Sequence, residues 1–348
     1  WSRSGCHFVG RLGGVASRRR PGTRHSDPPG GTITIAQTLS LLRFACLHAL
    51  TITVALVDVG VHVSLAMADD SLSEYQQAYV DQRYGMFVCY NMPTYTGQEW
   101  AHAGLDPNVF APTASLSSAA DQWAATAKAS GMTYGVLTTK HPDGFALWDS
   151  DQSSYDIAST AWYSDPSNPN YHVDVLKCYA DSFRSRGLGV GFYYSVWDRM
   201  NGLGPKWFSD EPNVTQKTSA EATAYVKQEL GHLLTAYGPV DVIWTDAWGW
   251  LDRYGLGGSG YDYVNYADVY SYIKQVSPRT LLLENSYEFN LTHTDIVCYE
   301  QRPLPSAGNL LPSEVCGTIR SDDKWFYAAA GNNGLRSVAA VGEQIRVV

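Results

Sequence analysis

The sequence of 348 residues predicts an α/β fold, a (β/α)8-like TIM barrel in which parallel strands alternate with helices. Two observations support this prediction. From residue 69 onward, short runs rich in β-branched and aromatic residues alternate with helix-like segments, which is typical of a parallel sheet covered on both faces. In addition, no glycine-rich turn of the dinucleotide-binding type follows the first run, which favours a barrel over an open doubly wound sheet.

The predicted strands and helices follow one another in order along this part of the chain. Strands are predicted at 85–90, 133–139, 188–195, 240–246, 280–286 and 295–300, and helices at 117–130, 173–186, 218–237 and 262–276. The helix at 218–237 has the clearest signals. Thr218 and Glu221 form a capping box, apolar residues recur at helical spacing, and Gly238-Pro239 then ends the helix.

Residues 1–68 differ from the rest of the chain, and we expect them to form a non-globular leader or a signal or anchor segment. They contain seven Arg and two Asp, a net charge of +5, whereas the remaining 280 residues carry 18 basic and 32 acidic groups, a net charge of −14. An apolar segment at 33–68 ends in "AMA", which matches a signal cleavage site and predicts a secreted or periplasmic protein. Alternatively, translation starts at Met67 and the protein is cytoplasmic. Arg43 and Asp58 interrupt the apolar segment, so we expect no stable membrane insertion.

Charge and cysteine usage exclude several classes of function. The acidic body contains no run of Lys or Arg that would bind a phosphate backbone, so nucleic acid is not an expected partner. The six Cys lack CxxC spacing, so we predict neither a zinc site nor a disulfide framework. His141 and Asp143 are potential ligands of a metal-dependent hydrolase, but no HxH or HExxH pair accompanies them, and we predict no metal and no cofactor. The oligomeric state is not predicted.

Polar residues recur where the predicted strands end. In the segment "TTKHPDGFALWDS" at 138–150, a turn requires Pro and Gly but does not require the Lys, His and Asp beside them. Comparable polar residues at other strand ends are Asp198, Asp246, Glu284, Asn285 and Glu300. In a barrel, the carboxyl ends of the strands meet on one rim, where active sites of this architecture form. We therefore expect these segments to share one pocket.

Asp246 is the first candidate catalytic residue. It ends the otherwise apolar strand "VIWTD" and is flanked by Trp244, Trp248 and Trp250. A buried carboxylate must be hydrogen-bonded, paired or functional, because its desolvation is costly. Two carboxylates are the minimal set for glycoside cleavage, and indole faces pack against the C–H faces of sugars. We therefore interpret Asp246 as a nucleophile or base beside an aromatic surface that includes Trp248. The alternative is an Asp that caps the following turn.

Two glutamates are candidates for the second carboxylate. Glu300 ends the predicted strand "DIVCYE", whereas Glu314 lies in the predicted loop "PSEVCGT". A strand positions a side chain more rigidly than a loop does, which favours Glu300, and Glu284 is a third candidate. For Glu300 and Glu314, the alternative is a structural salt bridge, for instance with Arg302 or Arg320.

Five ordered blocks of the sequence resemble those of glycoside hydrolase family 29, the α-L-fucosidases. They are "YGMFVCYNMPTYTGQEW", "YGVLTTKHPDGFALWDS", "GLGVGFYYSVWD", "YVKQELGHLLTAYGPVDVIWTDAWGW" and "SEVCGTIRSDDKWFY". The resemblance spans residues 84–347 and implies a retaining mechanism on a TIM barrel, with Asp246 as nucleophile and either Glu300 or Glu314 as acid/base. It also implies that the sugar pocket is lined by Glu99, Trp100, His141, Tyr194 and Trp325.

The sequence departs from this family at two pocket positions and at its end. Cys89 and Pro142 replace two His residues that usually bond sugar hydroxyls. After "WFY" the sequence resembles only the helix that precedes the last strand, so we expect residues 69–348 to form a catalytic barrel that is incomplete at the C-terminus, without the closing strand and the C-terminal β-sandwich. The implied function is exo-hydrolysis of terminal α-L-fucosides, or of a related sugar, from oligosaccharides or glycoconjugates. A catalytically inactive carbohydrate-binding relative is the alternative.

Overall fold

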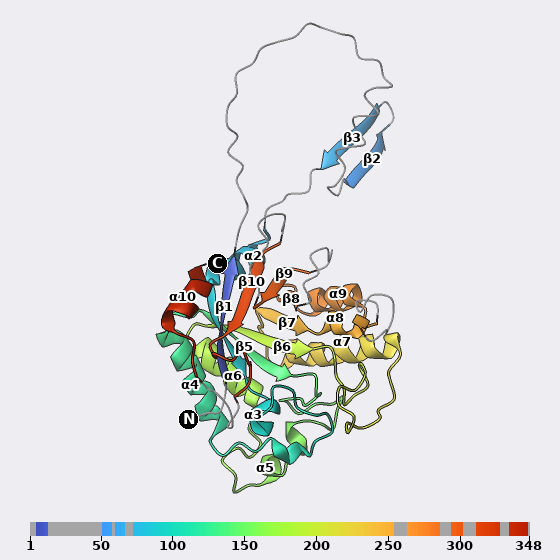
Figure 1. The fold of residues 1–348 in the computed structure, drawn as a ribbon. Coiled ribbons are helices and arrows are strands. Elements are labelled where there is room, and N and C mark those ends of the chain that lie inside the picture. The colour runs from blue at the N-terminus through green and yellow to red at the C-terminus, as the bar shows by residue number, and fades with distance from the viewer. Residues whose placement is uncertain are drawn as a thin grey trace. The chain divides into compact units, whose positions relative to one another are not determined.

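The computed structural model describes residues 5–12, 51–57, 60–66, 72–253, 263–285, 294–301, 311–327 and 334–346. The chain divides into two compact units, one formed by residues 1–13 and 72–348 and the other by residues 14–71. The first unit is a barrel of strands surrounded by helices (Figure 1). In the second unit, strands β2 (Thr51–Val57) and β3 (Gly60–Ala66) form an antiparallel hairpin.

Seven parallel strands form most of the barrel. In barrel order they are β4 (Tyr84–Cys89), β5 (Tyr134–Lys140), β6 (Gly189–Ser195), β7 (Val242–Asp246), β8 (Leu281–Asn285), β9 (Ile296–Glu300) and β10 (Ser313–Thr318). Each strand pairs in parallel with the next one along the chain. The predicted α/β fold is confirmed as a TIM-like barrel that has seven of the eight parallel strands and is incomplete in this sense. The segment around Glu314, however, is the strand β10 and not a loop, so that part of the prediction was wrong.

An eighth strand closes the barrel from the N-terminal part of the chain. Strand β1 (Gly5–Leu12) runs antiparallel between β4 and β10, with Gly5 opposite Cys89 on one side and Val9 opposite Cys316 on the other. The boundary expected between a leader at residues 1–68 and the barrel at residues 69–348 thus does not separate β1 from the other barrel strands. The physical reason is that β4 and β10 would otherwise present unpaired backbone groups at two sheet edges, and β1 pairs with both.

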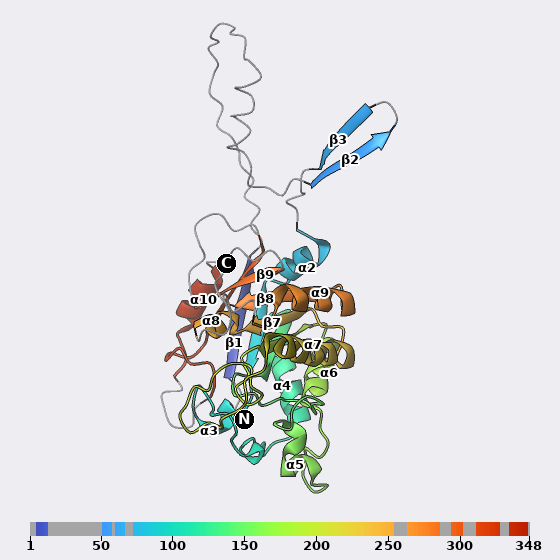
Figure 2. The same ribbon diagram turned by 90° about the vertical axis from the view of Figure 1, so that its right-hand side faces the viewer.

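Helices surround the barrel (Figure 2). They are α2 (Glu74–Gln82), α3 (Pro93–Thr96), α4 (Leu116–Ala129), α5 (Ala161–Ser164), α6 (Val175–Ser185), α7 (Ser219–Ala236), α8 (Trp248–Arg253), α9 (Tyr266–Val276) and α10 (Val338–Arg346). The four predicted helices correspond to α4, α6, α7 and α9, and α7 begins with the predicted capping box of Thr218 and Glu221. Within the described residues, we find no helix that combines the length and the apolar character needed to span a bilayer.

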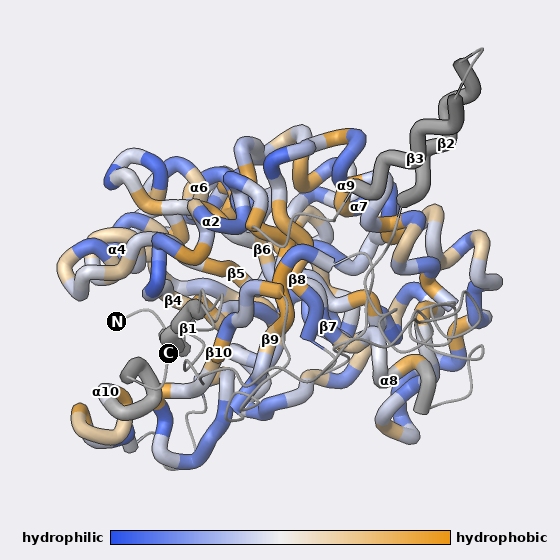
Figure 3. Tube along the Cα trace, turned by 90° about the horizontal axis from the view of Figure 1, so that it is seen from above, coloured by the Kyte–Doolittle hydropathy of each residue, from blue (hydrophilic) through white to orange (hydrophobic). Residues whose placement is uncertain are grey.

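Alternating side chains of the strands build two apolar layers. On β7, Trp244 belongs to a cluster inside the barrel, whereas Ile243 belongs to the larger cluster between the sheet and the helices. Phe87 and Tyr193 lie inside with Trp244, at ring centroid distances of 5.3 and 5.4 Å from it. Hydrophobic residues are accordingly concentrated in central strands such as β5 and β8 (Figure 3). The inner layer continues to the carboxyl ends of the strands, where polar side chains replace apolar ones.

Candidate active site

A pocket of about 340 Å³ lies at the carboxyl ends of the strands. Four lining residues are the last residues of their strands: Cys89 in β4, Asp246 in β7, Asn285 in β8 and Glu300 in β9. The other lining residues are Phe87, Glu99, Trp100, Thr138, His141, Tyr193, Trp244, Trp325 and Phe326. Because active sites of this architecture form on this rim, the pocket is the candidate active site.

Asp246 and Glu300 share one amide group. Nδ2 of Asn285 donates a hydrogen bond to Oδ1 of Asp246 at 3.1 Å and another to Oε2 of Glu300 at 2.8 Å. Since these two lengths add to 5.9 Å, the two acceptor oxygens lie at most about 5.9 Å apart. If each oxygen follows one of the two N–H bonds of the amide, which diverge by about 120°, the separation is about 5 Å. The structure therefore brings two predicted catalytic residues together.

Hydrogen bonds hold both carboxylate oxygens of Asp246. Its Oδ2 accepts from the hydroxyl of Tyr193 at 2.7 Å, and its Oδ1 also accepts from the backbone N–H of Ala247 at 2.7 Å. Ala247 has a φ of 72°, in the left-handed region that costs a non-glycine residue about 1–2 kcal/mol. Burial raises the pKa of Asp246, while the hydrogen bonds from Tyr193, Ala247 and Asn285 oppose this rise. Neutral donors thus orient the carboxylate without compensating its charge.

Glu300 has an unusually high proton affinity for a glutamate. Burial raises its pKa to about 7, and the negative charge of Asp246 adds to the rise, whereas hydrogen bonds from Asn285 and Trp325 oppose it. A carboxyl group with this pKa is partly protonated at neutral pH, so it can donate a proton in one step and accept one in the next. Neighbouring carboxyl groups in different environments are the arrangement that separates acid and nucleophile roles.

Glu314, the other predicted acid, is not among the residues that line the pocket. It lies on β10, fully buried inside the barrel, one layer below Glu300. Its carboxylate accepts hydrogen bonds from Nε1 of Trp244 at 2.7 Å and from the hydroxyls of Tyr79 and Tyr134 at 2.6 and 3.2 Å. These contacts make Glu314 part of the packing inside the barrel.

Four of the predicted sugar-binding residues, Glu99, Trp100, His141 and Trp325, line the pocket. Glu99 accepts the backbone N–H of Trp325 at 2.8 Å, which fixes the segment after β10 against the pocket. Burial lowers the pKa of His141 to about 3, and the positive charge of Arg199 contributes, so the imidazole is neutral. A neutral imidazole provides one donor and one acceptor, which suits hydroxyl groups.

Tyr194 and Trp248, which were also predicted to bind the sugar, lie outside the pocket lining. The hydroxyl of Tyr194 donates to Glu229 on helix α7 at 2.6 Å. Trp248 is fully buried and packs edge-on against Tyr266, at a centroid distance of 4.8 Å. For Tyr194 the physical reason is alternation: Tyr193 faces the pocket, so the next residue on the same strand faces the helices. For Trp248, the chain has already left β7 and entered α8.

Several pocket residues were not assigned a catalytic or sugar-binding role from the sequence. They are Phe87, Cys89, Thr138, Tyr193, Trp244, Asn285 and Phe326, of which Cys89 and Asn285 lie in segments that were expected at the pocket. Alternation could have identified some of them: because Asp246 faces inward, so does Trp244 two residues before it, and Asn285 rather than Glu284 faces inward on β8. Phe326 lies beyond the last strand, where no such pattern exists.

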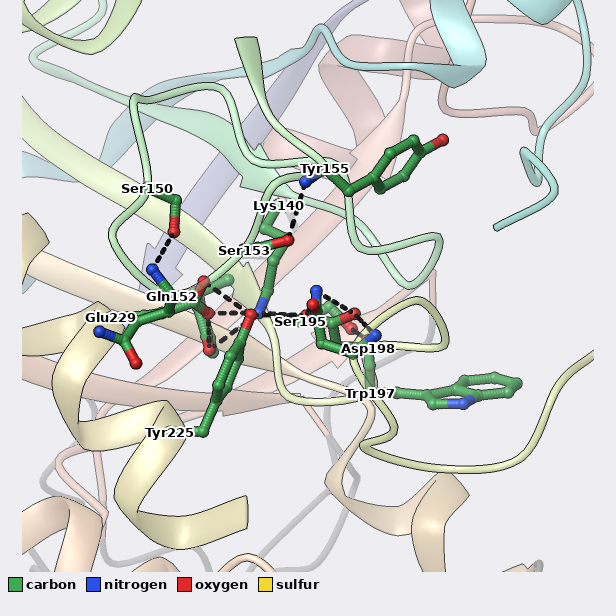
Figure 4. A network of polar contacts seen from close by, with 12 residues as sticks. Lys140, Ser150, Gln152, Ser153, Tyr155, Ser195, Trp197, Asp198, Tyr225 and Glu229 are labelled. Atoms are coloured by element: carbon green, nitrogen blue, oxygen red, sulfur yellow. Dashed lines mark hydrogen bonds and ion pairs between the residues drawn. The ribbon is translucent and has the colours of Figure 1, made fainter. Parts of the chain in front are cut away.

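Lys140, at the end of β5, is not among the residues that line the pocket, and its side chain extends into a buried charged network (Figure 4). A bulge between Thr138 and Lys140 interrupts the alternation there. Nζ of Lys140 lies 2.9 Å from Oδ2 of Asp198 and also forms an ion pair with Glu229 on α7, and all three side chains are completely buried. The network therefore ties the end of β5 to the segment after β6 and to α7.

The turn after Lys140 requires the glycine that the sequence contains. Gly144 has a φ of 94°, and a Cβ atom there would lie 2.3 Å from Oδ1 of Asp198. Asp143 is buried in the same turn, and burial raises its pKa to about 8. These polar residues, which have no obvious role in an isolated turn, thus shape the segment that carries His141 into the pocket.

Two further pairs of potential ligand side chains lie in or beside the barrel. Nδ1 of His141 and Oδ1 of Asp143 are 4.0 Å apart, and among the described residues no three His, Cys, Asp or Glu side chains are grouped so that they could hold a metal ion. Cys298 and Cys316 are buried in neighbouring strands with their sulfur atoms 3.5 Å apart, and both are free thiols.

Comparisons of the sequence give consistent matches. Residues 67–348 match the sequence model of the family described as "Alpha-L-fucosidase". The chain is 33% identical over 205 residues to the putative alpha-L-fucosidase 1 of Oryza sativa subsp. japonica and 29% identical over 203 residues to alpha-L-fucosidase 1 of Arabidopsis thaliana. Each alignment covers 58% of this chain and 34% of the relative. The chain thus spans about a third of the length of these two curated relatives.

Two solved structures of other proteins have the same fold as this chain. A glycoside hydrolase 29 family member from an unknown rumen bacterium matches with a TM-score of 0.59 and 23% identity, over 79% of this chain and 50% of that one. Alpha-L-fucosidase isoenzyme 1 from Paenibacillus thiaminolyticus matches with a TM-score of 0.55 and 24% identity, over 79% of this chain and 67% of that one.

Proposed function

Because the chain belongs to the α-L-fucosidase family, glycoside hydrolase family 29, we propose that it hydrolyses terminal α-L-fucosides of oligosaccharides or glycoconjugates with retention of configuration. The observation that carries this proposal is the bridge that Asn285 forms between Asp246 and Glu300. Retaining glycosidases place their two carboxyl groups about 5–5.5 Å apart, whereas inverting enzymes need about 6.5–9.5 Å to admit a water molecule. A separation of at most about 5.9 Å supports retention.

The first step forms a glycosyl-enzyme. A carboxylate oxygen of Asp246 attacks the anomeric carbon of the fucose, and a C–O bond forms between them. The glycosidic bond breaks at the same time, and the leaving oxygen takes the proton of the Glu300 carboxyl group. The elevated pKa of Glu300 supports this role, because the group must be protonated when the substrate arrives.

The second step returns the enzyme to its starting state. Glu300, now a carboxylate, removes a proton from a water molecule, and the water oxygen attacks the anomeric carbon. The ester bond to Asp246 breaks, fucose leaves with its original anomeric configuration, and Glu300 is protonated again. Asn285 contacts both carboxyl groups and is available to keep them aligned as the charge moves from one to the other.

The remaining pocket residues suit a deoxy sugar. Phe87, Trp244 and Phe326 offer apolar surface to the C–H groups and the methyl group of fucose. Glu99 and the neutral imidazole of His141 offer hydrogen bonds to its hydroxyl groups.

Hydrolysis of 4-nitrophenyl α-L-fucoside by the full chain tests the proposal. NMR should detect α-L-fucose as the first product, and β-L-fucose as the first product would refute retention. An Asp246→Gly variant should be inactive and should form β-L-fucosyl azide when azide is added, because azide then enters the face that the carboxylate occupied. A Glu300→Ala variant should instead give α-L-fucosyl azide from the same substrate. Glu314→Ala, matched in chemistry but outside the pocket, should give no azide product.

A catalytically inactive carbohydrate-binding protein is the second candidate. It is favoured by Cys89, whose thiol lines the pocket where the family usually has a His. A thiol is a weak hydrogen-bond donor and would hold a sugar hydroxyl less firmly. Calorimetric binding of fucose without turnover of any aryl glycoside would support this candidate over the hydrolase.

A further inference from the structure

Trp207, in the segment after β6, is 43% exposed. No other tryptophan whose exposure the structure describes is as exposed. A single exposed apolar side chain is ordinary on a protein surface, but exposed aromatic rings that continue a pocket mark interaction sites. The surroundings of Trp207 therefore decide whether its exposure has a function.

The ring of Trp207 continues an aromatic wall of the pocket. It stacks on Trp100 with a centroid distance of 5.9 Å and an interplanar angle of 18°. Trp100 lines the pocket and lies 5.2 Å from the ring of His141, which is also in the lining. Trp207 itself is not in the lining. The three rings thus form one aromatic surface that leads from the pocket to the solvent-exposed edge of the protein.

Buried charges fix the segment that carries Trp207. The backbone N–H of Trp207 donates to Oε2 of Glu211 at 2.7 Å, and that of Ala103, three residues after Trp100, donates to Oε1 at 2.9 Å. Oε1 also pairs with the guanidinium of Arg199 at 2.7 Å, and both side chains of this pair are fully buried. One carboxylate therefore holds the two segments that carry the stacked indoles in a fixed relative position.

The same cation connects this arrangement to the turn beside the pocket. Nε of Arg199 donates to the carbonyl of Pro142 at 2.9 Å, and its Nη2 donates to the carbonyl of Ala101 at 2.6 Å. Removal of either member of a buried ion pair is costly, so the geometry of the surface is strongly specified. A pre-organised aromatic surface binds a ligand with little loss of conformational entropy.

From these observations, and on the premise of the proposed fucosidase function, we infer that Trp207, stacked on Trp100 of the pocket wall, forms the binding site for the leaving sugar, the unit to which the fucose is attached. The fucose occupies the pocket next to Asp246 and Glu300, so the next unit must lie toward the pocket opening. The ligand class is a pyranose with one face of C–H groups, which stacks on indole rings. Beside the two indoles, Nδ1 of His102 and Oδ1 of Asp210 are 2.9 Å apart.

Two substrates that differ only in the leaving group test this inference. One is a fucosyl disaccharide, and the other is α-L-fucosyl fluoride, which has no leaving sugar and needs little acid assistance. We expect Trp207→Ala to lower kcat/KM for the disaccharide by about 10-fold, equivalent to about 1.4 kcal/mol, and to change kcat/KM for the fluoride by less than about two-fold. Trp207→Phe, which keeps an aromatic ring, should restore part of the loss.

Each other outcome overturns the inference in an identifiable way. An equal loss for both substrates would mean that Trp207 acts on the fucose pocket, and no loss for either would mean that the leaving sugar binds elsewhere. Hydrolysis of neither substrate by the unmodified chain would refute the proposed function itself, and the leaving-sugar site with it. Tyr171→Ala is the matched control, because Tyr171 is also 43% exposed and packs against His172 instead of a pocket residue. It should change neither rate.

Discussion

Replacement of Lys140 by Met is expected to destabilise the folded protein by about 3–5 kcal/mol. The structure provides the reason. Nζ of Lys140 forms ion pairs with Asp198 and Glu229 and a hydrogen bond of 3.0 Å with the hydroxyl of Tyr194, and these groups are completely buried. Met fills a similar volume but leaves two carboxylates facing each other without a cation. Since a domain is stable by about 5–15 kcal/mol, this loss is a large fraction of the total.

The loss should depend on pH in a defined direction. Burial already raises the pKa of Glu229, and Lys140 is the largest influence that lowers it. Without the Lys, the folded-state pKa of Glu229 rises further above its unfolded value. The stabilising effect of the bound proton is then complete below the unfolded pKa and is lost as pH rises through the folded pKa. The variant should therefore lose less stability, relative to the original protein, at pH 5 than at pH 8.

Urea unfolding followed by circular dichroism at both pH values measures these differences. A loss below about 1 kcal/mol, or an equal loss at both pH values, would refute the reasoning. A Lys140→Met, Glu229→Gln double variant should recover part of the stability, because it removes one of the two unpaired charges. Lys177→Met is the control: Lys177 pairs with Asp181 on the surface of α6, where both side chains are more than half exposed, and no measurable change is expected.

Further predictions concern the proposed catalytic pair, Asp246 and Glu300, and its hydrogen bonds. For an oligosaccharide substrate, kcat/KM should fall as pH rises through about 7, because the Glu300 carboxyl group must be protonated to donate a proton to the leaving oxygen. A Glu300→Gln variant should keep activity only toward substrates with activated leaving groups. If kcat/KM of that variant still falls near pH 7, the fall must be assigned to another group. Asn285→Ala should lower kcat/KM about 10²-fold and move this fall to higher pH, since the hydrogen bond from the amide lowers the pKa of Glu300. A pH profile of kcat/KM that does not move would contradict the hydrogen-bond bridge from Asn285 to Glu300. Tyr193→Phe removes a hydrogen bond that opposes the rise in the pKa of Asp246. The acidic limb of the pH profile, where Asp246 becomes protonated, should therefore move to higher pH. Thr139→Ser, a control on the neighbouring strand outside the pocket, should leave the acidic limb unchanged.

The fold and the identity of one carboxylate follow directly from the sequence, because both depend on local patterns. Runs of apolar residues define six of the seven parallel strands, and the carboxylate of Asp246 stands out because it ends such a run. The choice between Tyr193 and Tyr194 required only the two-residue alternation of a strand. A resemblance assigns a residue block to the pocket but does not say which of two adjacent side chains faces it.

Other features depend on relations between distant segments that no local pattern contains. Glu300 and Glu314 both face the barrel interior, and only the register of β9 against β10 places the second one layer deeper. Lys140 leaves the expected alternation because of a bulge, which has no distinctive sequence in this chain. The strand β1 pairs with β10 across about 300 residues of sequence, so its place in the barrel could not be read from the composition of the N-terminal segment.

The direction of β1 has a practical consequence for handling the protein. A parallel eighth strand would finish at the rim that carries the pocket, but β1 runs the other way and therefore begins there, with Gly5 opposite Cys89 of the pocket wall. An affinity tag or fluorescent label that is attached directly to Gly5 would consequently start at the rim that carries the pocket. A protease site that lets such a fusion be removed should precede any kinetic comparison.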